Sequence, residues 1–555
     1  MASTEEDWKA KVARKQASLQ AKVPKEWRLP ESITSLLKLP LAEHPNRLID
    51  LDIPRRSGLL SERELQITEK YTVRSLLIAL RSGEISAVEV TTAFCKRACV
   101  AGQLTNCLTE TYYDEALSRA RELDLARERG DALGPLHGLP ISLKDSFQIA
   151  GSEATIGYVS YLDRKSEENS ALVDLLLQQG AILYVKTNVP QTMMTADSEN
   201  NIFGRTLNPH NTLLTAGGST GGEGALVAFR GSILGVGTDV AGSIRIPALC
   251  DGLYGFKPTT SRVPYGGQAR AGDAGNSFFL AAAGPLANDL EGIADWMEVV
   301  IGARPARFDA AALDVPWRQL QPKQQLRIGV LEPDPFFPLQ PPVQRTLHEA
   351  VARLQSQGHT LVTLRADKTR IAEATVVSWA MFGLMSDGFA RLRASGEPFI
   401  QSLQAGGALA SKLAQQAIPR PQYDSSMTDL QRLAAVTVHR DALKESWRKL
   451  WNLHNLDVVI APAAQCTAPL HDTFSLPAYT VLLNCLDYPA CVIPFGQGSR
   501  DKDGQPFVVK PEQFCPEYDV DAADGAPCVI QVFANRMQDE ECLRAAKVID
   551  ACLKG

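Results

Sequence analysis

The spacing of apolar residues predicts a helix at the start of the chain. Over residues 1–30, apolar side chains recur at three- and four-residue steps with charged residues between them, the pattern of a helix with one buried face. The positions on this face are Trp8, Val12, Lys15 and Leu19. Basic residues only slightly outnumber acidic ones here, so we expect an amphipathic helix that lies on the main body rather than on a membrane surface.

Helices and strands then alternate along the N-terminal half. Thr72 and Ser86 each stand just before an apolar stripe, where a polar side chain caps the start of a helix. Two short apolar runs, 139–144 and 181–186, are typical of strands, and the helical stretch 170–180 precedes the second of them. This alternation predicts an α/β fold built from layers of helix and sheet.

The second half of the chain contains fewer clear elements. Residues 260–330 are predicted to be loop-rich up to a strand near their end, and residues 341–440 to be largely helical. A buried strand is expected at 456–462 and a terminal helix at 538–553. The pattern therefore remains α/β to the end of the chain.

No internal repeat, low-complexity tract or long linker divides the sequence. We expect a helical and irregular N-terminal extension over 1–65 and a single large domain over 66–555.

The chain has 555 residues, of which 45% are apolar and 22% charged, and this composition excludes a disordered chain, a collagen and a coiled-coil rod. The net charge of −6 provides no basic field for binding nucleic acid.

The cysteines and the N-terminus indicate a compartment. Eleven cysteines are scattered without a CxxC pair, which is typical of reduced, buried side chains. Cys95 and Cys99 lie four residues apart, and we expect them to pack on one helix face rather than bind a metal. The N-terminus lacks the apolar core of a secretory signal, and no apolar run has the length of a membrane span. We therefore expect no transmembrane segment and a cytoplasmic location.

A glycine-rich segment at 217–224 admits three interpretations. A phosphate-binding loop would need Gly-Lys-Ser/Thr at its end, whereas Glu223 follows Gly222 here and would repel phosphate. The pattern GxSxG around Ser219 matches the nucleophile elbow of an esterase, but no clear buried strand precedes it. The third interpretation is a serine–serine–lysine arrangement.

Two further segments favour this third interpretation. Ser243 follows several small residues, where consecutive backbone N–H groups can converge on an oxyanion. Lys144 ends the apolar run 139–144, and its pKa must fall by about three units from about 10.4 before it can act as a base near neutral pH. The alternative role for Lys144 is a salt bridge to a carboxylate such as that of Asp145.

Three motifs together resemble the amidase signature family. They are 134–145, 217–224 and 238–247, and they place Lys144, Ser219 and Ser243 at the spacing of that family. The lead-in resembles fungal acetamidase-type members, and 187–194 is similar to fatty-acid amide hydrolases, whose N-terminal membrane helix is absent here. The resemblance implies a large twisted mixed sheet sandwiched between helices.

The resemblance also implies the site residues. Ser243 would be the nucleophile, Ser219, on a cis peptide, would bridge it to Lys144, and neutral Lys144 would be the general base. The oxyanion hole would use backbone N–H groups of Val240, Ala241, Gly242 and Ser243. The family uses no metal or organic cofactor, so none is expected.

Other residues surround this predicted triad. Thr220 stands where many members have a second serine and retains a hydroxyl. Asp239 and Arg245 flank Ser243 and are expected to orient its loop as a charged pair. Met193 and Met194 are candidates for an acyl pocket, with plain core packing as the alternative. Residues 400–420 are expected to form either a lid or an ordinary surface helix.

The expected reaction is hydrolysis of a small-molecule carboxamide to a carboxylic acid and ammonia or an amine. One alternative is the amidase subunit of a glutamine-dependent tRNA amidotransferase, which passes ammonia to a partner. Others are a non-enzymatic member of the fold and a specialised hydrolase of esters or secondary amides, including an esterase that uses Ser219. A homodimer is the default expectation for association.

Overall fold

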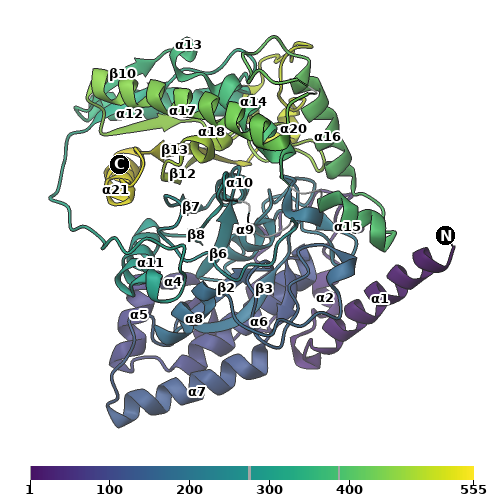
Figure 1. The fold of residues 1–555 in the computed structure, drawn as a ribbon. Helices are drawn as coiled ribbons and strands as arrows, with labels where there is room; N and C mark the ends of the chain where they lie inside the picture. Colours follow the sequence, from purple (N-terminus) through teal and green to yellow (C-terminus); the bar gives the residue numbers. More distant parts are fainter. Residues whose placement is uncertain (1, 273–274, 276, 386–387, 425) are drawn as a thin grey trace.

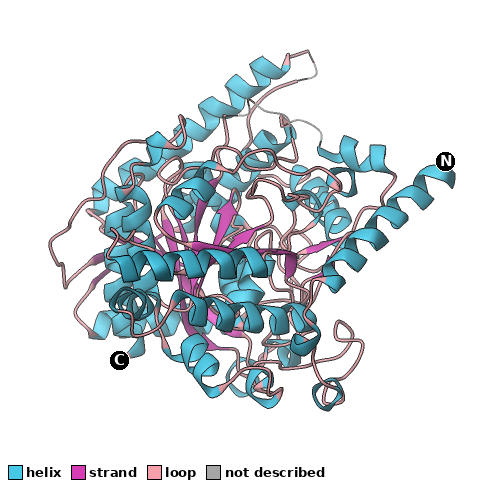
Figure 2. Cartoon of the chain, turned by 90° about the horizontal axis from the view of Figure 1, so that it is seen from below, coloured by secondary structure: helices cyan, strands magenta, loops and turns pink. Residues whose placement is uncertain are grey.

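Eleven strands form one sheet through the centre of the computed structural model, which describes residues 2–272, 275, 277–385, 388–424 and 426–555 (Figures 1 and 2). The strands are β1 (Leu108–Thr111), β2 (Pro140–Lys144), β3 (Ile182–Thr187), β6 (Leu234–Asp239), β7 (Tyr254–Lys257), β8 (Ala282–Ala287), β9 (Arg327–Leu331), β10 (Thr360–Leu364), β11 (Val458–Ala461), β12 (Ala490–Gln497) and β13 (Pro527–Phe533). A separate two-stranded ribbon pairs β4 (Glu199–Asn200) with β5 (Gly204–Arg205).

The sheet is mixed. Its spatial order is β1-β3-β2-β6-β8-β7-β12-β13-β11-β9-β10. Strand β2 runs parallel to both β3 and β6, and β9 runs parallel to both β10 and β11, whereas the remaining neighbours are antiparallel. Helices flank the sheet on both sides (Figure 2), and the prediction of a large mixed sheet between helices is confirmed.

The helices begin and end largely where the polar caps indicate. Thr72 and Ser86 are the N-caps of α5 and α6, each in a reciprocal capping box, and α5 ends at Gly83 in the left-handed region. The helices are α1 (Ala2–Ala21), α2 (Glu31–Thr34), α3 (Ile53–Arg56), α4 (Glu62–Lys70), α5 (Val73–Ser82), α6 (Ala87–Thr105), α7 (Tyr113–Arg129), α8 (Ala171–Gln178), α9 (Gly221–Ala228), α10 (Arg245–Cys250), α11 (Leu290–Gly302), α12 (Pro341–Ser356), α13 (Ala366–Thr369), α14 (Ile371–Gly383), α15 (Gly388–Ser395), α16 (Gln401–Ala414), α17 (Asp429–His454), α18 (Ala478–Leu486), α19 (Arg500–Asp503), α20 (Val520–Ala523) and α21 (Asp539–Lys554).

Two stretches differ from the prediction. The region 260–330 is not merely loop, because it contains the buried strand β8 and the helix α11. Strand β8 consists of Ala, Gly, Pro and Leu, which have little intrinsic strand preference, so its pairing with β6 and β7 holds it extended. Within 341–440, β10 interrupts the helices as a partly exposed edge strand.

Helix α1 lies against the main body (Figure 1). Val12 is buried, and Trp8 and Leu19 pack with it on a cluster that includes Ile202 and Phe203. Lys15, on the same face, forms ion pairs with two carboxylates, those of Glu110 and Glu153. The apolar face of this helix is therefore covered by the protein itself.

The eleven cysteines are all free thiols, and nine of them, including Cys95 and Cys99 on α6, are buried. Among the described residues, no group of three potential ligands could hold a metal ion. Every helix in the described ranges is too short or too polar to cross a membrane.

Candidate active site

The end of strand β2 brings Lys144 to the glycine-rich loop. The Lys144 side chain is fully buried, and its Nζ donates hydrogen bonds to Ser219 Oγ at 2.7 Å and to Thr238 Oγ1 at 2.9 Å. Ser219 lies just before α9, and Thr238 lies near the end of β6. Since Lys144 belongs to the motif 134–145, this buried amine joins all three predicted motifs.

The adjacent carboxylate does not pair with this lysine. Asp145 instead lies 3.4 Å from Lys186 Nζ and accepts a hydrogen bond from the Ile156 N–H at 2.7 Å. Successive side chains of a strand point to opposite faces of the sheet, so Asp145 points away from Lys144. Within the described residues, no carboxylate lies within salt-bridge distance of Lys144 Nζ. Burial consequently lowers the pKa of Lys144 to about 7, because nearby negative charges offset only part of the desolvation.

Close backbone contacts explain the glycines around Ser219. A Cβ on Gly217, which has a φ of +75°, would lie 2.9 Å from the Pro247 backbone. A Cβ on Gly218 would lie 2.5 Å from the carbonyl oxygen of Thr195. The Gly218–Ser219 peptide bond is cis. The loop therefore packs directly on the α10 segment that follows Ser243.

Ser243 lies in the short loop between β6 and α10 and is 8% exposed. The Gly242 N–H donates to Asp239 Oδ1 at 2.8 Å, while the Ala241 carbonyl accepts from Thr480 Oγ1 at 2.7 Å. The Ile244 N–H donates to Asp239 Oδ2 at 3.1 Å. The N–H groups of the other three loop residues, Val240, Ala241 and Ser243, form no hydrogen bond within the described part of the chain. They remain available to a bound oxyanion.

Asp239 and Arg245 form a buried pair that fixes this loop. Two Arg245 nitrogens donate to the two Asp239 oxygens, each at 3.0 Å, and both side chains are fully buried. Arg245 also donates to Asn484 Oδ1 at 2.7 Å and to Gln531 Oε1 at 2.9 Å. Burial alone raises the pKa of Asp239, but the charge and hydrogen bonds of Arg245 outweigh it and bring the pKa to about 2.

Glu223 is a second buried carboxyl group, one helical turn after Ser219. Three contacts run from its Oε2 to Ser142 Oγ (2.5 Å), on to Ser232 Oγ (2.8 Å) and on to the Leu234 carbonyl (2.9 Å). Each contact needs one proton, and the two serines supply only two. A protonated Glu223 supplies the third, in agreement with burial raising its pKa to about 8.

The remaining predicted residues lie around this centre. Thr220 Oγ1 donates to the Thr238 carbonyl at 3.3 Å. Met193 packs in an apolar cluster with Ile400 and Leu403, near the start of α16, whereas Met194 is 48% exposed. Met193 therefore packs inside the protein, and Met194 lies at the surface.

The nucleophile-elbow interpretation does not fit the structure. Residues 206–220, all described, contain no strand before Ser219, and the hydroxyl of Ser219 is hydrogen-bonded to Lys144.

Sequence reasoning missed several groups around the site: Thr238, Thr480, Asn484, Gln531 and the protonated Glu223. Thr238 and Glu223 lie inside the recognised motifs, so a polar residue in a buried segment was the available signal. The other three also interrupt apolar, buried segments, but these segments are distant in the sequence, so nothing linked them to the site.

Comparisons with known proteins identify the family of the chain. The model of the Amidase family matches residues 89–543. The chain is 38% identical to an amidase of Gibberella moniliformis over 99% of both chains, and 35% identical to an acetamidase of Emericella nidulans over 99% of this chain and 98% of that one. The solved structure of a fatty acid amide hydrolase superposes with a TM-score of 0.87 at 31% identity, covering 100% of this chain and 96% of that chain. The chain belongs to the amidase signature family, whose members hydrolyse the C–N bonds of amides.

Proposed function

We propose that the chain cleaves a carboxamide through an acyl-enzyme on Ser243, with Ser219 and Lys144 carrying the protons. The observation that supports this most is the environment of Lys144, a buried amine bonded to hydroxyl groups and not to a carboxylate. A lysine with a pKa of about 7 is neutral in a large fraction of molecules at physiological pH, as a general base must be.

In the first half of the reaction, Ser243 Oγ bonds to the amide carbon. Its proton passes to Ser219 Oγ, whose own proton passes to Lys144 Nζ. The carbonyl oxygen becomes an oxyanion, which accepts hydrogen bonds from the free N–H groups of Val240, Ala241 and Ser243. The Gly242 N–H donates to Asp239 instead, so its part in the oxyanion hole is to keep the loop in shape.

The second half returns the protons. Lys144 gives its proton back through Ser219 to the departing nitrogen, the C–N bond breaks, and ammonia or an amine leaves. Water then attacks the acyl-enzyme, and its proton follows the same route while Ser243 regains its hydroxyl. The products are a carboxylic acid and a free Ser243.

The relatives suggest where to begin with substrates. One is named an acetamidase and a structural neighbour is named a fatty acid amide hydrolase, so the acyl group ranges from very short to long. We therefore propose a primary carboxamide of a small molecule as the first substrate class, with the domain over 66–555 as the catalytic unit.

The test is ammonia release from a panel of primary amides, from acetamide through aryl to long-chain amides, with Ser243→Ala as the matched control. We expect release by the wild type and loss with Ser243→Ala. A serine-directed fluorophosphonate, located by peptide mass spectrometry, should label Ser243. Labelling of Ser219 alone would support the esterase alternative, and labelling without ammonia release would support a partner-dependent subunit.

A further inference from the structure

A cavity of about 400 Å³ lies between the loop after β2, the segment 268–272 and helix α15. Its described lining residues include no aspartate or glutamate. It contains four basic side chains, those of Arg164, Lys165, Arg270 and Arg391. This concentration of positive charge favours an anionic ligand.

An aromatic ring holds two of these cations in place. The guanidinium groups of Arg164 and Arg391 lie 5.3 and 5.5 Å from the centroid of the Tyr161 ring. The Tyr161 hydroxyl donates to the carbonyl oxygen of Arg270 at 2.8 Å, which ties the third segment to the same ring. The ring therefore positions the charges of Arg164 and Arg391, and of Arg270 it fixes the backbone, while the side chains of Arg164, Lys165 and Arg270 remain exposed to solvent.

Two of the acidic groups near these cations in the chain have other partners, whereas Glu167 and Glu168, which follow Lys165 closely, form no ion pair with a described residue. Asp163, next to Arg164, pairs with Arg14 of α1 at 2.6 Å, and Glu153 pairs with Lys15 at 2.9 Å. Within the described residues, no carboxylate lies within salt-bridge distance of the Arg164, Lys165 or Arg270 side chains. No described carboxylate therefore neutralises these three cations, and an anionic ligand could do so.

The deepest polar group of the cavity is also without a partner. Gln268 is only 4% exposed, and neither its Nε2 nor its Oε1 has a hydrogen-bond partner among the residues that the structure describes. Its backbone is fixed, because Gln268 bridges to Phe147 and the Ala269 N–H donates to Ser146 O at 2.9 Å. An unsatisfied buried amide costs about 1–3 kcal/mol, so a bound group that accepts from Nε2 would remove a real penalty.

We propose that this cavity binds a carboxylate or phosphate group of a small molecule, held by Arg164, Arg270 and the Nε2 of Gln268. The cavity adjoins the strand end that carries Lys144, since Ser146 and Phe147 follow it directly, but none of the three proposed catalytic residues lines it. The anion can come from a free metabolite or from the acidic end of a substrate's acyl group. Only the second source rests on the proposed amidase function.

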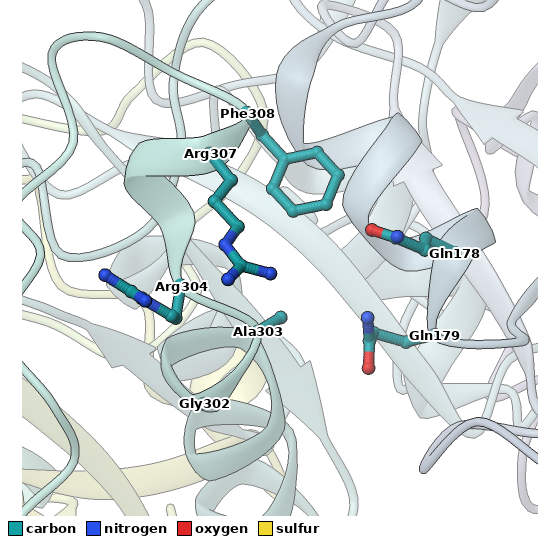
Figure 3. A pocket seen from close by; sticks show the side chains of 7 residues that line it. All are labelled: Gln178, Gln179, Gly302, Ala303, Arg304, Arg307 and Phe308. Atoms are coloured by element: carbon teal, nitrogen blue, oxygen red, sulfur yellow. The ribbon is translucent and has the colours of Figure 1, made fainter.

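A second cavity provides the matched control. It has a volume of about 530 Å³ and lies between α8 and α11, where Arg307 points toward Phe308 and two glutamines (Figure 3). Its other arginine, Arg304, is paired with Asp314 at 2.5 Å, and no lining side chain is a buried group without partners. Arg307→Gln therefore removes one cavity-lining charge of the same type at a place where we expect no anion site.

The binding test is calorimetric titration of the full chain with inorganic phosphate and with succinate at constant ionic strength, with succinamide as the uncharged probe. We expect saturable one-to-one binding of an anion and not of succinamide. Arg164→Gln with Arg270→Gln, and separately Gln268→Leu, should weaken it by about tenfold or more, and Arg307→Gln should not. Absence of saturable binding, or equal weakening by Arg307→Gln, would overturn the proposal.

Kinetics then identify the source of the anion. If it is the acyl end of a substrate, the double arginine variant should raise KM for a monoamide of a dicarboxylic acid about tenfold, leaving kcat and the hydrolysis of an uncharged amide of equal length unchanged. If it is a free metabolite, phosphate or succinate should change hydrolysis of the uncharged amide in the wild type only. Failure to hydrolyse any amide would contradict the proposed function, while the titration would still decide this inference.

Discussion

Lys144 and Lys186 lie on the neighbouring strands β2 and β3, and both are fully buried, yet their partners differ in kind. Lys186 Nζ lies 3.4 Å from a carboxylate oxygen of Asp145 and donates to the carbonyl of Glu153 at 2.7 Å. Among the described residues, the hydrogen-bond partners of Lys144 Nζ are all hydroxyl groups. In the strand register, Lys186 is opposite Leu143 and Thr187 is opposite Lys144. Because neighbouring residues of a strand point to opposite faces, the side chains of Lys144 and Lys186 lie on opposite faces of the sheet.

The same contrast holds for two buried acids. Asp239 is paired with Arg245, and its pKa is about 2, whereas the hydrogen-bond partners of Glu223 in the described part of the chain are hydroxyl groups, and its pKa is about 8. Both carboxyl groups are buried, so burial alone does not set their charge. A partner of opposite charge keeps a buried group ionised, and its absence leaves the group neutral. A buried ionisable group with a partner of opposite charge therefore has a structural role, whereas one without such a partner can exchange protons.

The largest expected effect comes from exchanging the two lysines for methionine. Lys144→Met should reduce kcat/KM by about 10²–10⁴-fold, because the base is lost. Lys186→Met should instead leave Asp145 buried without its cation and lower the free energy of unfolding by about 3–5 kcal/mol, with activity retained in the folded fraction. Ammonia release measures the activity of the two variants, and thermal unfolding at one scan rate measures their stability. If both variants lost the same activity and had the same stability, the two lysines would not differ in role.

The two lysine variants should also differ in how stability depends on pH. The folded pKa of Lys144, about 7, lies below its ordinary value of 10.5, so its contribution to stability is present above pH 10.5 and is lost as the pH falls through 7. Methionine does not titrate. The unfolding midpoint of Lys144→Met should therefore exceed that of the wild type, and by more at pH 6 than at pH 10. A smaller difference at pH 6 would contradict a neutral lysine.

The two acids provide the next test. Asp239→Asn should cost about 3–5 kcal/mol of stability and most of the activity, because Arg245 is left buried without its counter-ion. Glu223→Gln should cost less than about 1 kcal/mol, since an amide NH₂ can replace the acid O–H toward Ser142 and the Oε1 can still accept from Thr187. Denaturant unfolding and ammonia release check both. A Glu223→Gln variant as damaged as Asp239→Asn would show that Glu223 is ionised.

The smallest effect is expected at Thr220. Thr220→Val removes the hydrogen bond to the Thr238 carbonyl and should cost about 0.5–1.5 kcal/mol, with less than a tenfold change in kcat. Thr220→Ser keeps the hydroxyl and serves as the control in the same unfolding and rate measurements. A large loss of kcat with valine and none with serine would place Thr220 in the proton path itself.

Much of the fold could be predicted from local signals. The caps at Thr72 and Ser86 and the apolar run that ends at Lys144 are properties of neighbouring residues, and the structure confirms the helices and the strand. Strand β8 was missed because its small residues are held extended by β6 and β7 and not by their own preference. The mixed sheet followed from the family resemblance.

The site was predictable only in part, for a similar reason. The residue types and spacing of Lys144, Ser219 and Ser243 were visible in the sequence. The partners that distinguish a base from a structural cation were not, because Asp145 is adjacent to Lys144 in the chain yet points to the other face of the sheet. Asn484 and Gln531, which hold Arg245, are more than 200 residues away from it.

The central claim is that Lys144 acts as a neutral base, and the pH dependence of kcat/KM for the best amide substrate tests it most directly. The account predicts a rate that rises with pH through a single ionisation of apparent pKa about 7, because the base is protonated and inactive below that value. The residual activity of Lys144→Met should lack this step. A wild-type rate that is constant between about pH 5.5 and 8.5, or a step that persists in the methionine variant, would contradict the account.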